Sequence, residues 1–140
     1  MANSLSYYAG LDIGGTTVKA VLVNHRAEQV GPLVEVRSRV KDGYEATFGQ
    51  LDDALDQLAA GAGIDRSAIA GIGLDVPAPS SQGVIWGRAN LGEDWVGTDI
   101  QEKFSARSGV PVHMTNDCNA AAIGEYALRH KHLGSLLLVA

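Results

Sequence analysis

The beginning of the chain constrains the fold most, because three β-rich segments come before the first helical pattern. Residues 7–13 read YYAGLDI and residues 16–23 read TTVKAVLV, and only Gly14 and Gly15 separate them. Two such segments joined by a Gly-Gly turn are typical of a β-hairpin. A third segment, 33–40, alternates valine with charged side chains, which predicts a half-buried strand. This start excludes a doubly wound fold, in which strands and helices alternate from the beginning.

After the third strand the apolar period changes to that of a helix. The residues that repeat at this spacing are Phe48, Leu51, Leu55 and Leu58. We expect this helix to end near Gly61, and a later helix to be capped by Thr98 and ended by Gly109. Strands and helices then alternate, and they are expected at residues 69–76 (strand), 98–108 (helix), 110–114 (strand), 119–130 (helix) and 136–139 (strand). The sequence therefore predicts an α/β fold with a mixed sheet and the order β-β-β-α-β-α-β-α-β.

Composition narrows the class of protein. The 140 residues are enough for one domain, and 46% are hydrophobic and 19% charged, as in ordinary globular proteins. A net charge of −5 argues against general nucleic-acid binding, which favours a basic surface. No apolar stretch reaches the roughly 18 residues of a membrane span, and no signal-peptide pattern is present. The single cysteine, Cys118, excludes an internal disulfide. We therefore expect a cytoplasmic protein with no nucleic-acid or membrane partner.

The Gly-Gly turn is the first candidate site. Gly14 and Gly15 leave backbone N–H groups uncovered, so an anion can approach them closely. Thr16 and Thr17 add hydroxyl donors, and Asp12 stands just before the turn, where it can hold a metal-bound water or a proton. The sequence has neither the G-K-[ST] of a P-loop nor the G-x-G-x-x-G of a dinucleotide site. A plain hairpin turn would also explain the glycines, so both interpretations stay open.

The second candidate site is the Asn116-Asp117 pair, which stands between the predicted strand at 110–114 and an Ala-rich segment. Asn and Asp are preferred helix N-caps, because their side chains accept hydrogen bonds from free helix N–H groups. Ligand sites in α/β sheets also gather at the carboxyl ends of strands. The pair therefore predicts either a helix cap or a ligand site.

Four motifs in fixed order carry a resemblance to a known family. They read LDIGGTTVKAVLV, GIGLDVPAP, ANLGEDW and NDCNAAAIGE, and they lie within residues 8–126. Together they resemble the ROK family of sugar kinases, which includes bacterial glucokinases and belongs to the sugar kinase/Hsp70/actin superfamily. The resemblance implies a ribonuclease H-like (actin-like ATPase) N-terminal lobe over residues 1–140. It also implies that the C-terminal lobe, with the second phosphate loop, is absent from this chain.

The resemblance implies a phosphoryl transfer to a hexose or amino-sugar hydroxyl, as in glucokinases. Asp117 matches the catalytic base, and it also belongs to the sugar site together with Asn116 and Asn90. The loop that faces the donor phosphates matches Gly14, Gly15, Thr16 and Thr17, and Asp12 matches the acid near the metal. The implied cofactors are Mg²⁺ and ATP or a polyphosphate donor. Ala78 departs from the usual G-x-P-G-P motif, which leaves the identity of the sugar open.

Two further alternatives stay open at this stage, a non-catalytic ROK protein and a pseudokinase or fragment that acts as an interaction module. A non-catalytic sugar-binding protein or transcriptional regulator of the ROK family would share the same motifs. Regulators of this kind carry a DNA-binding helix-turn-helix before the domain, whereas about seven residues precede the first predicted strand here, so the kinase is favoured. The resemblance is also compatible with a homodimer of the full-length protein.

Overall fold

The computed structural model describes residues 5–116, 119, 120, 127, 129 and 132. Its main sheet has five strands, β1 (Tyr7–Ile13), β2 (Thr17–Asn24), β3 (Val34–Arg37), β4 (Ile69–Val76) and β7 (Val112–Asn116). Two α-helices are described, α1 (Tyr44–Ala62) and α2 (Ile100–Ser108). A two-stranded hairpin of β5 (Ser80–Ser81) and β6 (Val84–Ile85) follows β4. Short 3-10 helices lie at Val40–Asp42, Arg66–Ala68 and Glu93–Trp95.

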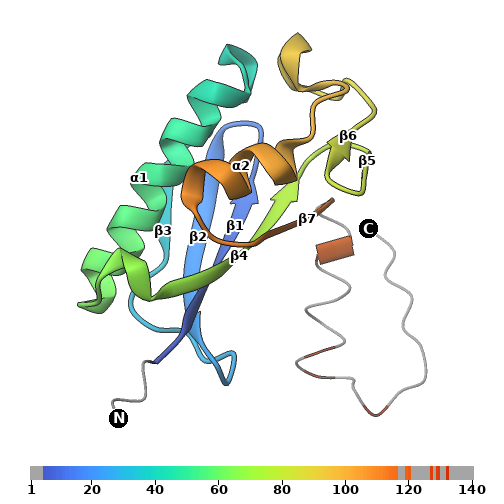
Figure 1. Cartoon of the computed structure of the whole chain (residues 1–140). Coiled ribbons are helices and arrows are strands. Elements are labelled where there is room, and N and C mark those ends of the chain that lie inside the picture. The colour runs from blue at the N-terminus through green and yellow to red at the C-terminus, as the bar shows by residue number, and fades with distance from the viewer. Residues whose placement is uncertain (1–4, 117–118, 121–126, 128, 130–131, 133–140) are drawn as a thin grey trace.

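The strand order across the sheet is β3-β2-β1-β4-β7. The first three strands pair antiparallel as a meander, and β1, β4 and β7 then run parallel to one another. This arrangement confirms the predicted mixed sheet and the predicted order as far as β7. Residues 119 and 120 are helical, as expected for the helix at 119–130, while the predicted strand at 136–139 lies outside the described residues. The parallel strands bring their carboxyl ends to one edge of the sheet (Figure 1).

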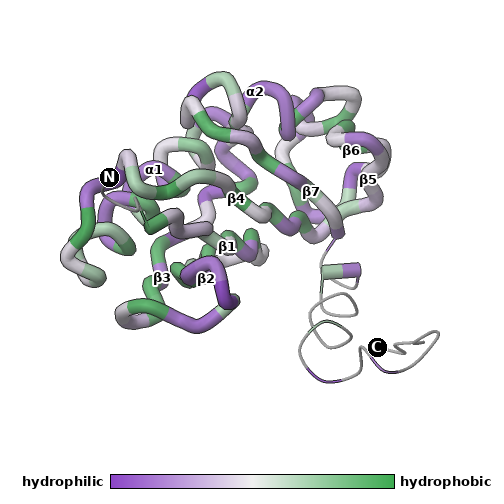
Figure 2. Tube along the Cα trace, turned by 60° about the horizontal axis from the view of Figure 1, so that its bottom comes forward, coloured by the Kyte–Doolittle hydropathy of each residue, from purple (hydrophilic) through white to green (hydrophobic). Residues whose placement is uncertain are grey.

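The core lies between the sheet and the two helices, which cover the same face of it (Figure 1). The four apolar residues that predicted α1 are all buried, with exposed fractions of 1% or less. Phe48 of α1 packs against Phe104 of α2, with 4.9 Å between the ring centroids. Figure 2 shows hydrophobic stretches within the sheet and hydrophilic stretches along α2, whose outer side faces solvent.

The predicted bounds of two strands, β3 and β7, needed correction. β3 ends at Arg37 and not at residue 40, since Arg39 adopts a left-handed conformation with φ of 55°. The next residue, Val40, is buried in a 3-10 helix. β7 covers Val112–Asn116 in place of 110–114, so Asn116 belongs to the strand.

The predicted end of α1 near Gly61 is confirmed to within one residue, since α1 ends at Ala62 and Gly63 follows in a left-handed conformation with φ of 67°. The predicted cap of α2 needed correction. α2 is capped by Asp99, whose side chain accepts a hydrogen bond from the N–H of Glu102 at 2.9 Å. The expected cap, Thr98, instead donates its hydroxyl to the carbonyl of Asp94. The predicted end of α2 at Gly109 is confirmed.

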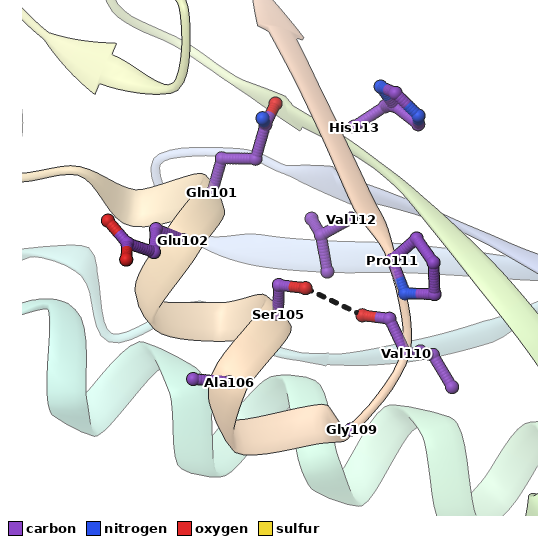
Figure 3. A pocket seen from close by; sticks show the side chains of 9 residues that line it. All are labelled: Gln101, Glu102, Ser105, Ala106, Gly109, Val110, Pro111, Val112 and His113. Atoms are coloured by element: carbon purple, nitrogen blue, oxygen red, sulfur yellow. Dashed lines mark hydrogen bonds between the residues drawn. The ribbon is translucent and has the colours of Figure 1, made fainter.

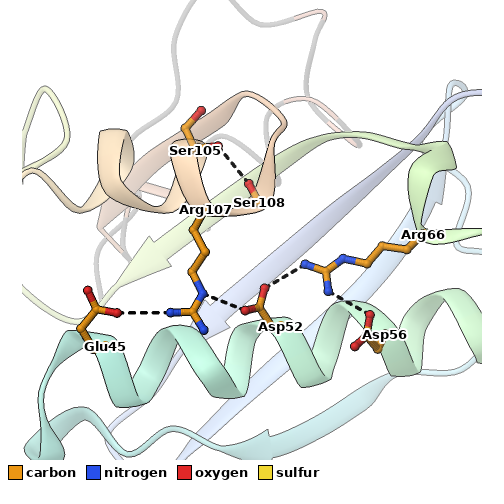
Figure 4. Close-up of polar contacts among 7 residues, drawn as sticks. All are labelled: Glu45, Asp52, Asp56, Arg66, Ser105, Arg107 and Ser108. Atoms are coloured by element: carbon orange, nitrogen blue, oxygen red, sulfur yellow. Dashed lines mark hydrogen bonds and ion pairs between the residues drawn. The ribbon is translucent and has the colours of Figure 1, made fainter.

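An ionic network fastens α2 and the segment before β4 to α1 (Figure 4). Asp52 lies at its centre and accepts hydrogen bonds from Arg66 Nη2 and Arg107 Nε, both at 2.8 Å. Arg66 also pairs with Asp56 at 2.9 Å, and Arg107 pairs with Glu45 at 3.2 Å. Partial burial opposes the charge of Arg66, but the hydrogen bonds to the two aspartates outweigh it and raise the pKa of its guanidinium.

We expect Asp52→Ala to lower the free energy of unfolding by about 1–2 kcal/mol, because it removes two charge-assisted hydrogen bonds at a partly buried position. Glu93→Ala is the matched control, since it breaks a single, fully solvated pair with Arg88. That control should change stability by less than about 0.5 kcal/mol. Urea denaturation of both variants measures the difference, and equal effects would contradict a structural role for the network.

Candidate active site

The β1–β2 hairpin presents an exposed turn at the carboxyl end of β1. The N–H of Gly14 donates to the carbonyl of Thr17 at 2.8 Å, which closes the turn. A Cβ on Gly14 would lie 2.8 Å from the same carbonyl oxygen, so the turn requires glycine there. A Cβ on Gly15 would meet nothing within 4 Å, and Gly15 and Thr16 are both exposed. The exposed part of the turn is therefore accessible to a ligand, and its role in binding donor phosphates stays a prediction.

The two glycines allow a test that separates folding from ligand binding. We expect Gly14→Ala to destabilise the protein by about 1–3 kcal/mol, because its methyl group has no room beside the backbone. Gly15→Ala should leave stability within about 0.5 kcal/mol of wild type, since its methyl group points into open space. Thermal melts measure these effects. If the turn binds the donor phosphates, Gly15→Ala should still raise the KM for the donor severalfold, and an unchanged KM would contradict that role.

The register of the sheet aligns polar residues in one row beside the hairpin. In this row Glu35, Lys19, Asp12, Asp75 and Thr115 are paired in turn across all five strands. Paired residues point to the same face of a sheet, and neighbouring strands lie about 4.8 Å apart. The Asp12 and Asp75 carboxylates are therefore neighbours, while Lys19 pairs with Glu35 at 3.9 Å. The site analysis of the sequence missed Asp75, because only the register shows that it stands beside Asp12.

Four members of this row line a cavity of about 810 Å³ on the face of the sheet opposite α1 and α2, namely Lys19, Asp12, Asp75 and Thr115. The cavity also contacts apolar residues of β2, and it reaches Ala120. No group of three His, Cys, Asp or Glu side chains able to hold a metal occurs within the described part of the chain. Mg²⁺, however, is usually held by only one or two carboxylates, with water and substrate phosphates as further ligands. The Asp12 and Asp75 pair therefore fits a Mg²⁺ ion bound together with a phosphate donor.

The Asn116-Asp117 pair is described only in part. Asn116 is the last residue of β7, where it pairs with Val76, and its Oδ1 accepts a hydrogen bond from the N–H of Asn119 at 2.8 Å. The interpretation of Asn116 as a helix cap is thereby confirmed, which leaves its amide N–H₂ as the group for a ligand. Asp117 lies outside the described residues, so its role as a base stays a prediction.

The loop that carries Asn90 is fixed to the segment between β3 and α1. Asn90 itself is exposed in a turn. Trp95 is fully buried, and its Nε1 donates a hydrogen bond to the carbonyl of Val40 at 3.0 Å. The same carbonyl also accepts a hydrogen bond from the N–H of Gly92 at 2.9 Å. Asp94 accepts from the first N–H of α1, at Tyr44. This segment also contacts the β1–β2 hairpin, since the N–H of Ser38 donates to the carbonyl of Thr16. The two predicted ligand loops are therefore held by one short segment.

A second cavity, of about 720 Å³, lies between α2 and the segment that leads into β7 (Figure 3). Two of its lining residues are hydrogen-bonded to each other, since the hydroxyl of Ser105 donates to the carbonyl of Val110 at 2.9 Å. Above it, Gln101 accepts a hydrogen bond from the N–H of Met114 and so covers part of the β7 edge. None of the predicted site residues lines this cavity.

Within the described part of the chain no helix is long and apolar enough to cross a membrane.

Comparisons with known proteins identify the family of the chain. A model of the ROK family matches residues 8–139. The glucokinase of Halalkalibacterium halodurans is 32% identical over 121 residues, which are 85% of this chain and 36% of that protein. The inorganic polyphosphate/ATP-glucomannokinase of Arthrobacter sp. strain KM superposes with a TM-score of 0.77 at 27% identity, over 89% of this chain and 49% of that one. A ROK family transcriptional regulator, homologous to the MLC protein of E. coli, superposes over 91% of this chain and 32% of that one, with a TM-score of 0.69. Because the two sequences are only 16% identical, this likeness shows the fold alone. The chain thus spans about a third of its curated glucokinase relative and half of the glucomannokinase.

Proposed function

The chain belongs to the ROK family, and from this premise we propose that the protein carrying it is a sugar kinase. The likeness to solved ROK kinases confirms the predicted ribonuclease H-like, actin-like ATPase fold. We propose that the reaction transfers a phosphoryl group to a hydroxyl of a hexose or amino sugar. The observation that carries this proposal is the row in which Asp12 and Asp75 stand beside the Gly14–Thr17 turn, at the carboxyl ends of parallel strands.

Each group of the site has a task in such a reaction. The N–H groups of the turn and the hydroxyls of Thr16 and Thr17 would bind the donor phosphates. The Asp12 and Asp75 carboxylates would hold Mg²⁺, which when bound neutralises charge on the transferred phosphoryl group. Asn90 and Asn116 would orient the sugar, because an amide both donates to and accepts from hydroxyls.

Asp117 would complete the reaction as its base. In the sequence it directly follows Asn116, which is the last residue of β7. An ionised carboxylate there would accept the proton of the attacking hydroxyl, so that the oxygen attacks the terminal phosphorus of the donor as the leaving phosphate departs. The relatives bear on the donor, since the glucomannokinase is described as using polyphosphate and ATP. We propose ATP or polyphosphate as the donor here.

A donor and sugar panel tests the proposal. The protein, expressed from its full reading frame, is incubated with Mg²⁺, ATP or polyphosphate, and glucose, mannose, N-acetylglucosamine or N-acetylmannosamine, and sugar phosphate is measured. We expect at least one hexose or amino sugar to be phosphorylated. Sugar binding seen by calorimetry without turnover from either donor would overturn the proposal in favour of a ROK regulator.

A further inference from the structure

A third cavity, of about 670 Å³, lies between the hairpin turn, residues 37–42 and Gln50 of α1, and it has a basic lining. We call it the basic pocket, and its defining residues are Gly15, Thr16, Arg37, Ser38, Arg39 and Lys41. The hairpin supplies the first two, Arg37 is the last residue of β3, and the segment after β3 supplies the others. The pocket is therefore continuous with the turn that we assign to the donor phosphates.

The charge of this pocket is opposite to that of the chain as a whole. Its lining holds three cations and one carboxylate, Asp42, whereas the net charge of the chain is −5. Arg39 pairs with Asp42 at 3.0 Å. Within the described part of the chain, Arg37 and Lys41 form no ion pair. Among the described residues, two cations thus have no ion-pair partner and lie beside the turn that we assign to the donor phosphates.

Ser38 provides an independent sign of a missing ligand. It lines the pocket and is fully buried, and its hydroxyl oxygen has no hydrogen-bond partner among the described residues. A buried hydroxyl without a partner costs about 1–3 kcal/mol, so such groups are rare without a reason. A phosphate oxygen bound in the pocket is an acceptor that this hydroxyl can use after a small shift of the neighbouring side chains.

The lining also indicates what kind of phosphate compound fits. It has no aromatic side chain, and its one aliphatic side chain, Val40, is only 1% exposed. A nucleoside would find no apolar surface on which to place its base. Arginine guanidinium groups, in contrast, bind phosphate oxygens in pairs of hydrogen bonds. The lining is therefore complementary to a chain of phosphates without a nucleoside.

We propose that the basic pocket binds a linear inorganic polyphosphate chain, with the end of that chain at the Gly14–Thr17 turn. This inference rests on the proposed function, because it takes the turn as the donor site. Arg37 and Lys41 contact phosphates beyond the transferred group, and Gln50 of α1, which also lines the pocket, donates an amide N–H to them. Asp42 limits affinity, since its carboxylate repels the chain and occupies Arg39.

Calorimetry and donor kinetics test this site with medium-length sodium polyphosphate and with ATP. We expect the triple variant Arg37→Gln, Arg39→Gln, Lys41→Gln to weaken polyphosphate binding by about 10- to 100-fold. The salt dependence of binding should also fall, by about one unit of log–log slope for each cation that contacts phosphate. ATP affinity should change by less than about threefold, because ATP places fewer phosphates in the pocket.

Two further variants exclude trivial explanations. Arg26→Gln removes a similar exposed charge beyond the far end of β2, and it should leave polyphosphate affinity unchanged. Asp42→Asn should raise polyphosphate affinity severalfold, a gain that misfolding cannot produce. An unchanged affinity in the triple variant, or equal losses for ATP and polyphosphate, would overturn the proposal. Polyphosphate binding is measured without sugar, so the two proposals can fail separately. If the protein binds polyphosphate as expected but phosphorylates no sugar, the proposed kinase activity is contradicted and the proposed polyphosphate site is retained.

Discussion

Replacing Asp117 with Asn will lower kcat for sugar phosphorylation by about 10²–10⁴-fold, the usual contribution of a general base. The amide has the size of the carboxylate and keeps its ability to cap a helix, but it cannot take the hydroxyl proton. Sugar affinity should change by only a few fold, because the substituted residue still offers hydrogen bonds. Initial rates at saturating sugar and donor measure kcat, and calorimetry measures sugar binding. A kcat within about threefold of wild type would exclude Asp117 as the base.

Asn116 offers the matched control for this experiment. Its Oδ1 accepts a hydrogen bond from the N–H of Asn119, and an Asp at this position would keep that cap. Asn116→Asp replaces the amide N–H₂ with a carboxylate oxygen and adds one negative charge, and because the cap is kept, stability should be nearly unchanged. If the amide binds the sugar, the KM for sugar should rise while kcat falls much less than in Asp117→Asn. The two neighbouring residues would then have separate roles, one in binding and one in proton transfer.

The sequence predicted those parts of the fold that short-range pattern determines. The hairpin followed from two β-rich segments around Gly14 and Gly15, and α1 followed from the helical spacing of its apolar residues. The exact ends of the elements were predicted less well. Asp99 caps α2 by accepting from the N–H of Glu102, while the hydroxyl of Thr98 donates to the carbonyl of Asp94. Threonine and aspartate are both common N-caps, so the local pattern at these two neighbouring residues does not decide which of them caps the helix.

The same limit applies to the site. Asp12 and the turn were found because they stand together in the sequence, but Asp75 becomes their neighbour only through the parallel pairing of β1 with β4. Likewise, the alternation in 33–40 placed Arg39 on the solvated face of a strand. The left-handed conformation of Arg39 ends that strand, and the segment after β3 then lines a pocket beside the hairpin. Register and backbone conformation at single residues are tertiary properties, and one sequence does not reveal them.

Replacing Asp12 with Asn will lower kcat/KM for the donor by about 10²–10³-fold, because electrostatic groups at a phosphoryl-transfer site commonly contribute that much. Asp12 is exposed at the carboxyl end of β1, so its substitution should change the free energy of unfolding by less than about 0.5 kcal/mol. The loss would therefore report on the reaction and not on the fold. Its physical cause is a weaker hold on Mg²⁺, so the Mg²⁺ concentration for half-maximal activity should rise as well.

The row across the sheet supplies both a second test and a control for this prediction. Asp75→Asn should shift the Mg²⁺ requirement in the same direction, because its carboxylate lies in the neighbouring strand at the same level. Glu35→Gln removes a carboxylate from the far end of the row, where it pairs with Lys19, and should leave the Mg²⁺ curve unchanged. Direct Mg²⁺ titrations in the presence of donor separate binding from turnover. If all three variants gave the same curve as wild type, the carboxylates of this row would not hold the ion, and Mg²⁺ would have to reach the site through the donor alone.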